Sequence, residues 1–244
     1  MLIQHEWGSL FPDAPTNTMI YHHHNECNKG MSMADPRMKK VKGDRYYGKT
    51  ARDYEVVRKK QPWWSVEQRE MQTLLDQLPS DLKVVDIPFG TGRFVAYYLA
   101  RNYEVHGLDA SQAMLETARS TLGDAYTQCQ TSAGFSTDLP FDDGQFDLLV
   151  STRFLRDIIL FRDVKKTMAE FARVTRRFAI IQLGVRLQEP FEVPPDDEKM
   201  GSRMSEEQTN AFLAEYGFGV KDHRFVKGVR DGSSEIRHIL CEKQ

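Results

Sequence analysis

The sequence predicts an α/β protein with a single doubly wound, seven-stranded, mostly parallel sheet, an antiparallel edge strand and helices on both faces. Three observations support this class. Strand-like and helix-like segments alternate from Lys83 to Leu183, an order that builds a parallel sheet covered by helices. A glycine-containing turn follows the first strand-like segment, where α/β folds bind ligands. Two strand-like segments near the C-terminus flank the turn 230–233, which favours an antiparallel hairpin at one sheet edge.

Seven β-rich segments supply the strands, and apolar residues at helical spacing supply the helices. The predicted strands are residues 83–87, 103–108, 125–129, 146–150, 178–183, 220–227 and 235–241. The first helix is predicted to begin at a capping Ser65, because Met71, Leu74 and Leu75 then share one apolar face. The remaining predicted helices are a segment ending near residue 101 and residues 111–120, 162–174 and 205–215.

Length and composition suit one large domain. The chain has 244 residues, of which 40% are hydrophobic, and we expect an irregular N-terminal arm over residues 1–43 and one domain over residues 44–244. The formal net charge of -2 argues against a general polyanion binder. Three separated cysteines without a CxxC pair indicate a reducing cytoplasm. No apolar run reaches the roughly 20 residues of a membrane span, so none is expected.

The most informative segment is the turn after the first predicted strand. Gly90 and Gly92 lack a Cβ atom, so a ligand can approach the backbone there, and the N–H groups that open the next helix attract an anionic group. Asp109 ends the second predicted strand, where a carboxylate can accept hydrogen bonds from both hydroxyls of a ribose. Together they predict a nucleoside-bearing cofactor. Val95 stands where a dinucleotide turn has its third glycine, which argues against a nicotinamide-dependent oxidoreductase.

The run from Asp86 to Gly92, Asp-x-Pro-x-Gly-x-Gly, resembles motif I of the class I, Rossmann-like S-adenosylmethionine-dependent methyltransferases. Residues 105–115 resemble the second motif of that superfamily, and residues 139–147 resemble the segment that leads into its fourth strand. The resemblance covers about residues 44–241. It implies S-adenosyl-L-methionine as the cofactor and methyl transfer to an O or N nucleophile of a small or medium-sized acceptor, saccharide-like molecules included.

The resemblance also implies roles for individual residues. Pro88 replaces the usual first glycine of motif I. The resemblance implies that Arg153 faces the sulfonium. The histidine pair that related enzymes carry after the fourth strand is absent here, and Asp157 is our candidate for a base or an orienting acid. The implied cofactor contacts are Tyr46, Asp86, Pro88, Gly90, Thr91, Gly92, Asp109, Ala110, Met114 and Ser151.

Several alternatives stay open. The chain could be a non-catalytic, regulatory S-adenosylmethionine-binding module, or a methyltransferase directed at RNA or polysaccharide. It lacks the Asn-Pro-Pro-Tyr and Pro-Cys motifs that methylation of DNA bases uses, and the sequence leaves a homodimer open. The run His22–His24 with Cys27 invites a zinc site. Adjacent histidines in an extended segment point to opposite sides, however, so an irregular lid without metal is expected.

Overall fold

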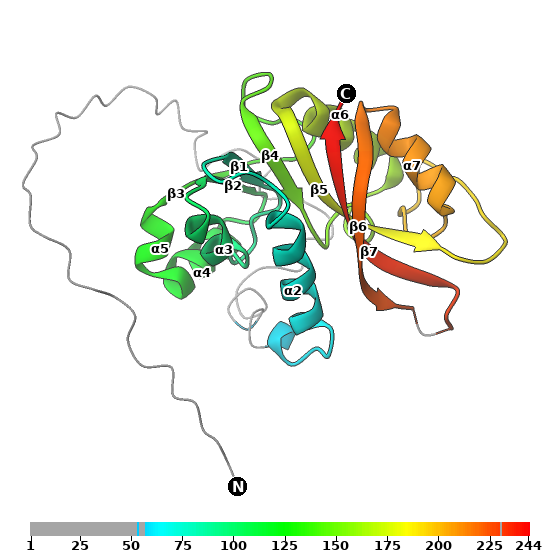
Figure 1. Cartoon of the computed structure of the whole chain (residues 1–244), viewed down its shortest axis with the longest axis horizontal. Helices are drawn as coiled ribbons and strands as arrows, with labels where there is room; N and C mark the ends of the chain where they lie inside the picture. The colour runs from blue at the N-terminus through cyan, green and yellow to red at the C-terminus, as the bar shows by residue number, and fades with distance from the viewer. Residues whose placement is uncertain (1–52, 54–56, 230) are drawn as a thin grey trace, which may run out of the picture. The chain divides into compact units, whose positions relative to one another are not determined.

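The computed structural model describes residue 53, residues 57–229 and residues 231–244. The predicted arm over residues 1–43, Tyr46 and the histidine run lie outside these described residues. A seven-stranded sheet forms the centre of the fold, in the order β3-β2-β1-β4-β5-β7-β6 (Figure 1). The strands are β1 (Lys83–Asp86), β2 (Glu104–Asp109), β3 (Cys129–Ala133), β4 (Phe146–Ser151), β5 (Thr175–Arg186), β6 (Phe218–Gly228) and β7 (Ser234–Lys243).

Strands β1 to β5 pair in parallel, and β7 pairs antiparallel with both β5 and β6. The predicted sheet and its C-terminal hairpin are therefore confirmed. The hairpin places β7 one position in from the edge, between β5 and β6. From β1 the chain proceeds through β2 to β3 toward one edge of the sheet, and from β4 it proceeds toward the opposite edge. The carboxyl ends of β1 and β4 thus form the switch point where open α/β sheets bind ligands.

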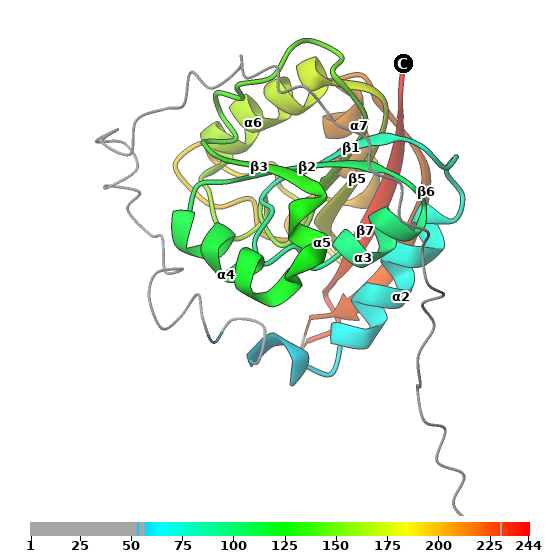
Figure 2. The same cartoon turned by 90° about the vertical axis from the view of Figure 1, so that its left-hand side faces the viewer.

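Helices cover both faces of the sheet (Figure 2). They are α2 (Trp64–Leu75), α3 (Val95–Ala100), α4 (Gln112–Leu122), α5 (Asp124–Thr127), α6 (Phe161–Val174) and α7 (Glu206–Ala214). Apolar side chains of α2, α3 and α4 form one core against the sheet, and those of α6 and α7 form another on the opposite face. No helix among the described residues is both long enough and apolar enough to cross a membrane.

Two local predictions are wrong. Residues 125–129 were expected to form the third strand, but Asp124–Thr127 is the short helix α5 and the strand begins at Cys129. Tyr126 explains the error. It is buried and lies edge-to-face with Phe89, as a strand residue could, but it belongs to a helix. Helix α2 begins at Trp64, so Ser65 lies inside its first turn and does not cap it.

Candidate functional site

The carboxyl edge of the sheet gathers polar side chains predicted to bind cofactor. Asp86 ends β1, Asp109 ends β2 and Ser151 ends β4, and all three are buried. Parallel pairing places Asp86 opposite Gly107 of β2 and Val150 of β4, so the three strand ends lie at one edge. The Ser151 hydroxyl is buried with no hydrogen-bond partner among the described residues. The structure therefore brings these three residues to the switch point.

Asp109 fastens the glycine turn to the next helix. The Gly90 N–H donates to one carboxylate oxygen of Asp109 over 2.8 Å, and the Ser111 N–H donates to the other over 2.8 Å. Gly90 and Gly92 adopt φ values of 58° and 70°, a conformation that L side chains rarely adopt. These two bonds hold the Asp109 carboxylate beside the turn at the end of β2.

The remaining predicted cofactor contacts surround this turn. A Cβ atom built on Gly90 would lie 3.7 Å from the terminal methyl group of Met114, so this buried methionine borders the turn. Thr91 is buried, whereas Pro88 and Ala110 are half-buried. Tyr46 is outside the described residues. The turn thus has an apolar side at Met114 and an acidic side at Asp109.

Asp86 is an acid in a site that disfavours charge. Its side chain is 2% exposed and accepts a hydrogen bond from the Tyr98 hydroxyl over 3.1 Å. Burial, with the nearby Asp109 charge, raises the pKa of Asp86 to about 8, although the Tyr98 bond and Arg93 act in the opposite direction. Asp86 therefore holds a proton near neutral pH.

A buried ion cluster connects the glycine turn with β4 and β5. Glu67 of α2 is 3% exposed and accepts from Arg93 Nη1 over 2.5 Å, from Arg153 Nε over 2.9 Å and from Gln182 Nε2 over 2.8 Å. Burial raises the pKa of Glu67, but the two arginines outweigh it and lower the pKa to about 2. Because Arg93 directly follows Gly92, this carboxylate joins the cofactor turn to the loop after β4.

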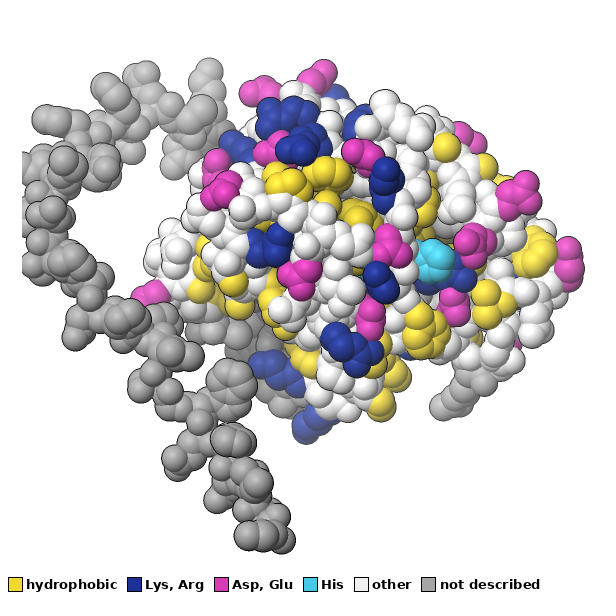
Figure 3. All heavy atoms as spheres, in the orientation of Figure 1, with side chains coloured by type: hydrophobic (Ala, Val, Ile, Leu, Met, Phe, Trp, Pro, Cys, Tyr) yellow, Lys and Arg dark blue, Asp and Glu magenta, His cyan; other side chains and the backbone are white. Residues whose placement is uncertain are grey.

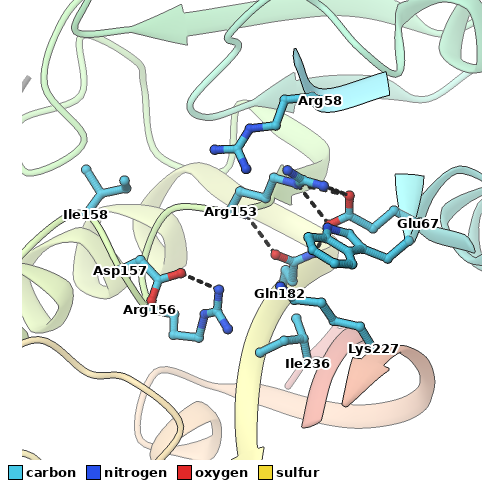
Figure 4. A pocket seen from close by; sticks show the side chains of 10 residues that line it. Arg58, Glu67, Arg153, Arg156, Asp157, Ile158, Gln182, Lys227 and Ile236 are labelled. Atoms are coloured by element: carbon cyan, nitrogen blue, oxygen red, sulfur yellow. Dashed lines mark hydrogen bonds and ion pairs between the residues drawn. The ribbon is translucent and has the colours of Figure 1, made fainter. Parts of the chain in front are cut away.

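A cavity opens beside this cluster (Figure 4). Its walls come from α2 and the segment before it, the loop after β4, and strands β5, β6 and β7. Both predicted catalytic residues, Arg153 and Asp157, line it. The other lining residues are Arg58, Trp63, Glu67, Arg156, Ile158, Gln182, Lys227 and Ile236.

The two predicted catalytic residues differ in their freedom. Arg153 has a φ of 55°, and its guanidinium is held by Glu67 and by Gln61 Oε1 at 3.1 Å. The Asp157 side chain is 53% exposed and pairs with Arg156. Arg153 is therefore a fixed part of the cavity wall, while the Asp157 carboxylate is accessible from the cavity.

Sequence reasoning missed three polar residues of this site. Glu67 stands four residues before Met71, on the apolar stripe of α2, and an acid on such a stripe indicates a buried partner. Gln182 and His238 interrupt apolar strands in the same way, and both are buried. Burial lowers the pKa of His238 to about 4, so its ring is neutral.

The described residues contain no candidate metal site, because no group of three or more of their His, Cys, Asp and Glu side chains could hold a metal ion. His22–His24 and Cys27 fall outside these residues. The surface view of Figure 3 shows acidic and basic side chains interspersed over the visible face. This mixture agrees with the net charge of -2.

Comparisons with known proteins find similarity to methyltransferases. Residues 84–177 match the family described as "Methyltransferase domain". A stretch of 133 residues, 53% of this chain, is 31% identical to the biotin biosynthesis bifunctional protein BioHC of Cellvibrio japonicus. That stretch spans about a quarter (24%) of the bifunctional protein.

Solved structures with this fold include two methyltransferases and a cyclase. The 1,6-didemethyltoxoflavin-N1-methyltransferase of Burkholderia thailandensis, solved with S-adenosylhomocysteine, has a TM-score of 0.59 at 16% identity, covering 80% of this chain and 84% of that one. Geranyl diphosphate methyltransferase has a TM-score of 0.58 at 16% identity, covering 74% and 77%. The [4+2]-cyclase SpnF has a TM-score of 0.60 at 16% identity, covering 75% and 84%.

The family match and the fold of the solved structures agree with the resemblance of the sequence motifs. Residues 84–177 match the methyltransferase-domain family, and the chain shares its fold with solved S-adenosylmethionine-dependent methyltransferases.

Proposed function

We propose that this protein transfers a methyl group from S-adenosylmethionine to an O or N nucleophile of a small acceptor bound in the cavity beside Glu67. One observation carries the proposal: the Asp109 carboxylate and the left-handed Gly90 meet at the switch point of a methyltransferase domain. The Arg93–Glu67–Arg153 cluster then leads from this turn to a cavity that contains an accessible carboxylate.

The residues at the turn fit the adenosyl and methionine parts of the cofactor. The Asp109 carboxylate would accept hydrogen bonds from the ribose hydroxyls, and the Met114 methyl group offers an apolar contact for a purine. Gly90 presents backbone without a side chain, and the buried Ser151 hydroxyl needs a partner that no described residue supplies. These residues would hold S-adenosylmethionine, which when bound supplies an activated methyl group.

The chain itself has to orient the acceptor, exclude water and receive a proton. Trp63, Ile158 and Ile236 supply apolar wall, which favours a desolvated acceptor. Asp157 would accept the proton of a hydroxyl or amine nucleophile, and Arg156 would hold its carboxylate in place. Arg153, fixed by Glu67, would shape the wall nearest the cofactor turn.

Calorimetry with S-adenosylmethionine on the full chain tests the cofactor site. Asp109→Ala should lower the affinity at least tenfold, because each lost hydrogen bond to a charged group is worth roughly 1.5–3 kcal/mol. The same change leaves the Gly90 and Ser111 N–H groups without their acceptor, so circular dichroism must show that the variant is folded. Asp124→Ala, at the exposed acid that begins α5, is the control. Unchanged affinity in Asp109→Ala would contradict the proposal.

A turnover assay tests catalysis separately. Formation of S-adenosylhomocysteine with a panel of small hydroxyl and amine acceptors should identify a substrate, and Asp157→Asn should then lower kcat more than it changes cofactor affinity. Equal kcat would remove Asp157 as the base.

A non-catalytic cofactor-binding module remains the second candidate. The fold neighbour SpnF is a cyclase, so this fold alone does not fix methyl transfer as the function. Tight S-adenosylmethionine binding without S-adenosylhomocysteine formation on any acceptor would favour the module over the enzyme.

A further inference from the structure

Positive charge dominates the cavity beside Glu67. Four cationic side chains line it, Arg58, Arg153, Arg156 and Lys227, against only two carboxylates, Glu67 and Asp157. This excess contrasts with the net charge of -2 of the whole chain. Cavities lined by one sign of charge with apolar walls raise the local concentration of ligands of the opposite sign.

The two carboxylates do not neutralise the cavity, because other groups already use them. Glu67 accepts bonds from Arg153, from Arg93 just outside the cavity, and from Gln182. Asp157 pairs with Arg156 through one guanidinium nitrogen, which leaves the other N–H donors of Arg156 for a ligand (Figure 4).

Lys227 of β6 is the cation with least compensation. Its ammonium group lies 4.0 Å from the centre of the Trp63 ring, and it forms no ion pair with any carboxylate of the described residues. Burial, and then the positive charges of Arg156 and Arg153, lower the pKa of Lys227. An anion between Lys227 and Arg156 would relieve this repulsion.

The cavity also has an apolar side. Trp63, Ile158 and Ile236 line it, and a planar or aliphatic body fits against such a surface. The acceptor site therefore combines an anion-binding end with an apolar wall.

We propose that the acceptor carries an anionic group, a carboxylate or a phosphate, which binds Lys227 and Arg156 while its apolar part packs on the Trp63 side. This inference rests on the proposed function, because it assigns the substrate class of the same cavity.

Calorimetry of the full chain with three probes tests the inference: benzoate, phenyl phosphate and their neutral counterpart benzamide, each with and without S-adenosylhomocysteine. We expect at least one anion to bind about tenfold or more tightly than benzamide, since hydrogen bonds between charged groups are stronger than those to a neutral amide. Benzoate as the tighter ligand identifies a carboxylate acceptor, and phenyl phosphate as the tighter ligand identifies a phosphate acceptor.

Lys227→Met should abolish this preference, since it removes the charge but keeps the length of the side chain. Lys221→Met is the matched control, because Lys221 lies on the same strand but pairs with Glu242 away from the cavity. Arg156→Gln serves as a second variant if Lys227→Met does not fold. Equal binding of benzamide and the anions, no anion binding, or an unchanged preference in the cavity variant would overturn the inference.

Titration of S-adenosylmethionine in the same samples separates the two proposals. Cofactor binding without anion preference overturns only the acceptor class. Anion binding without cofactor binding supports this inference as an anion site and overturns the proposed methyl transfer.

Discussion

At the scale of single residues, Glu67 is the most constrained side chain of the site. It is a buried carboxylate between two arginines, and each arginine belongs to a different functional segment, Arg93 to the glycine turn and Arg153 to the loop after β4. Removing one partner of a buried ion pair leaves uncompensated charge, which is more destabilising than losing the pair altogether. The position of Glu67 therefore links stability to the geometry of the site.

Glu67→Gln should lower the free energy of unfolding by about 3–5 kcal/mol, because it keeps the shape but removes the buried counter-charge of two half-buried guanidinium groups. Urea unfolding measures the loss. Glu70→Gln on the same helix is the control, since Glu70 pairs with the exposed Arg69 and such pairs contribute about 1 kcal/mol or less. Similar free energies of unfolding for the two variants would show that the charge of Glu67 does not contribute to the stability of the fold.

Asp86 gives a pH-dependent prediction. Its pKa is about 8 in the folded chain, against 3.8 as the ordinary value, so between these pH values the folded state keeps a proton that the unfolded state has lost. The free energy of unfolding must then fall as pH rises through that interval. Asp86→Asn removes this dependence.

Urea unfolding of both proteins at about pH 5 and about pH 9 tests the sign. Asp86→Asn should become more stable relative to the unsubstituted chain as pH rises, with Asp124→Asn as a control whose pH profile matches that of the unsubstituted chain. Parallel profiles for all three would mean that Asp86 is ionised in the folded state.

At the scale of helices and strands, sequence patterns predicted most of the fold. The alternation from β1 to β5 and the C-terminal hairpin follow from apolar periodicity and turn residues, which act over a few residues. Strand β3 was not predicted correctly, because its residues Cys129–Ala133 have no strong apolar pattern. As an edge strand, β3 pairs only with β2. The strand was predicted instead around Tyr126, which is buried but belongs to α5.

The residues gathered at the carboxyl edge of the sheet were found from the sequence, whereas only Arg153 and Asp157 of the cavity lining were. Asp86, Gly90 and Asp109 lie within one βαβ unit, where spacing alone relates them. The cavity residues Glu67 and Lys227 come from segments 160 residues apart in sequence, at opposite ends of the domain, and only the sheet order brings α2 beside β6. No local pattern relates such positions.

Strand β5 supports the cavity through Gly184. A Cβ atom there would lie 1.9 Å from Ser202 Oγ and 2.9 Å from Arg156 Cδ, so the segment after β5 and the cavity arginine both depend on its absence. Gly184→Ala should lower the free energy of unfolding by about 1–3 kcal/mol through overpacking. It should also weaken binding of the anionic probe by displacing Arg156.

A second substitution makes this prediction specific. Ser202→Gly removes the two nearest atoms that the new methyl group would meet, Ser202 Oγ and Cβ, and leaves only the flexible Arg156 side chain, so the double variant should recover most of the lost stability in urea unfolding. Gly228→Ala on β6 is the control, because a Cβ atom there meets nothing within 4 Å. No recovery in the double variant would place the strain elsewhere.

At the scale of the whole described domain, the sheet joins two cores whose helices lie on opposite faces. The predicted cofactor site lies where β1 and β4 meet, with contributions from β2, the glycine turn and the end of β4. A ligand that binds there only in the folded state must stabilise the entire cooperative unit.

S-adenosylmethionine and S-adenosylhomocysteine should therefore raise the thermal unfolding midpoint of the full chain, while the reduced nicotinamide dinucleotide should not. At a free ligand concentration about 100 times Kd, binding stabilises by about 2.7 kcal/mol, which for a domain of this size corresponds to a rise of roughly 5–11 °C. Scanning calorimetry over a range of ligand concentrations measures the shift, and Asp109→Ala should abolish it. A shift with the dinucleotide alone would assign the switch point to redox chemistry, and equal shifts in the Asp109 variant would place the adenosyl group away from β2.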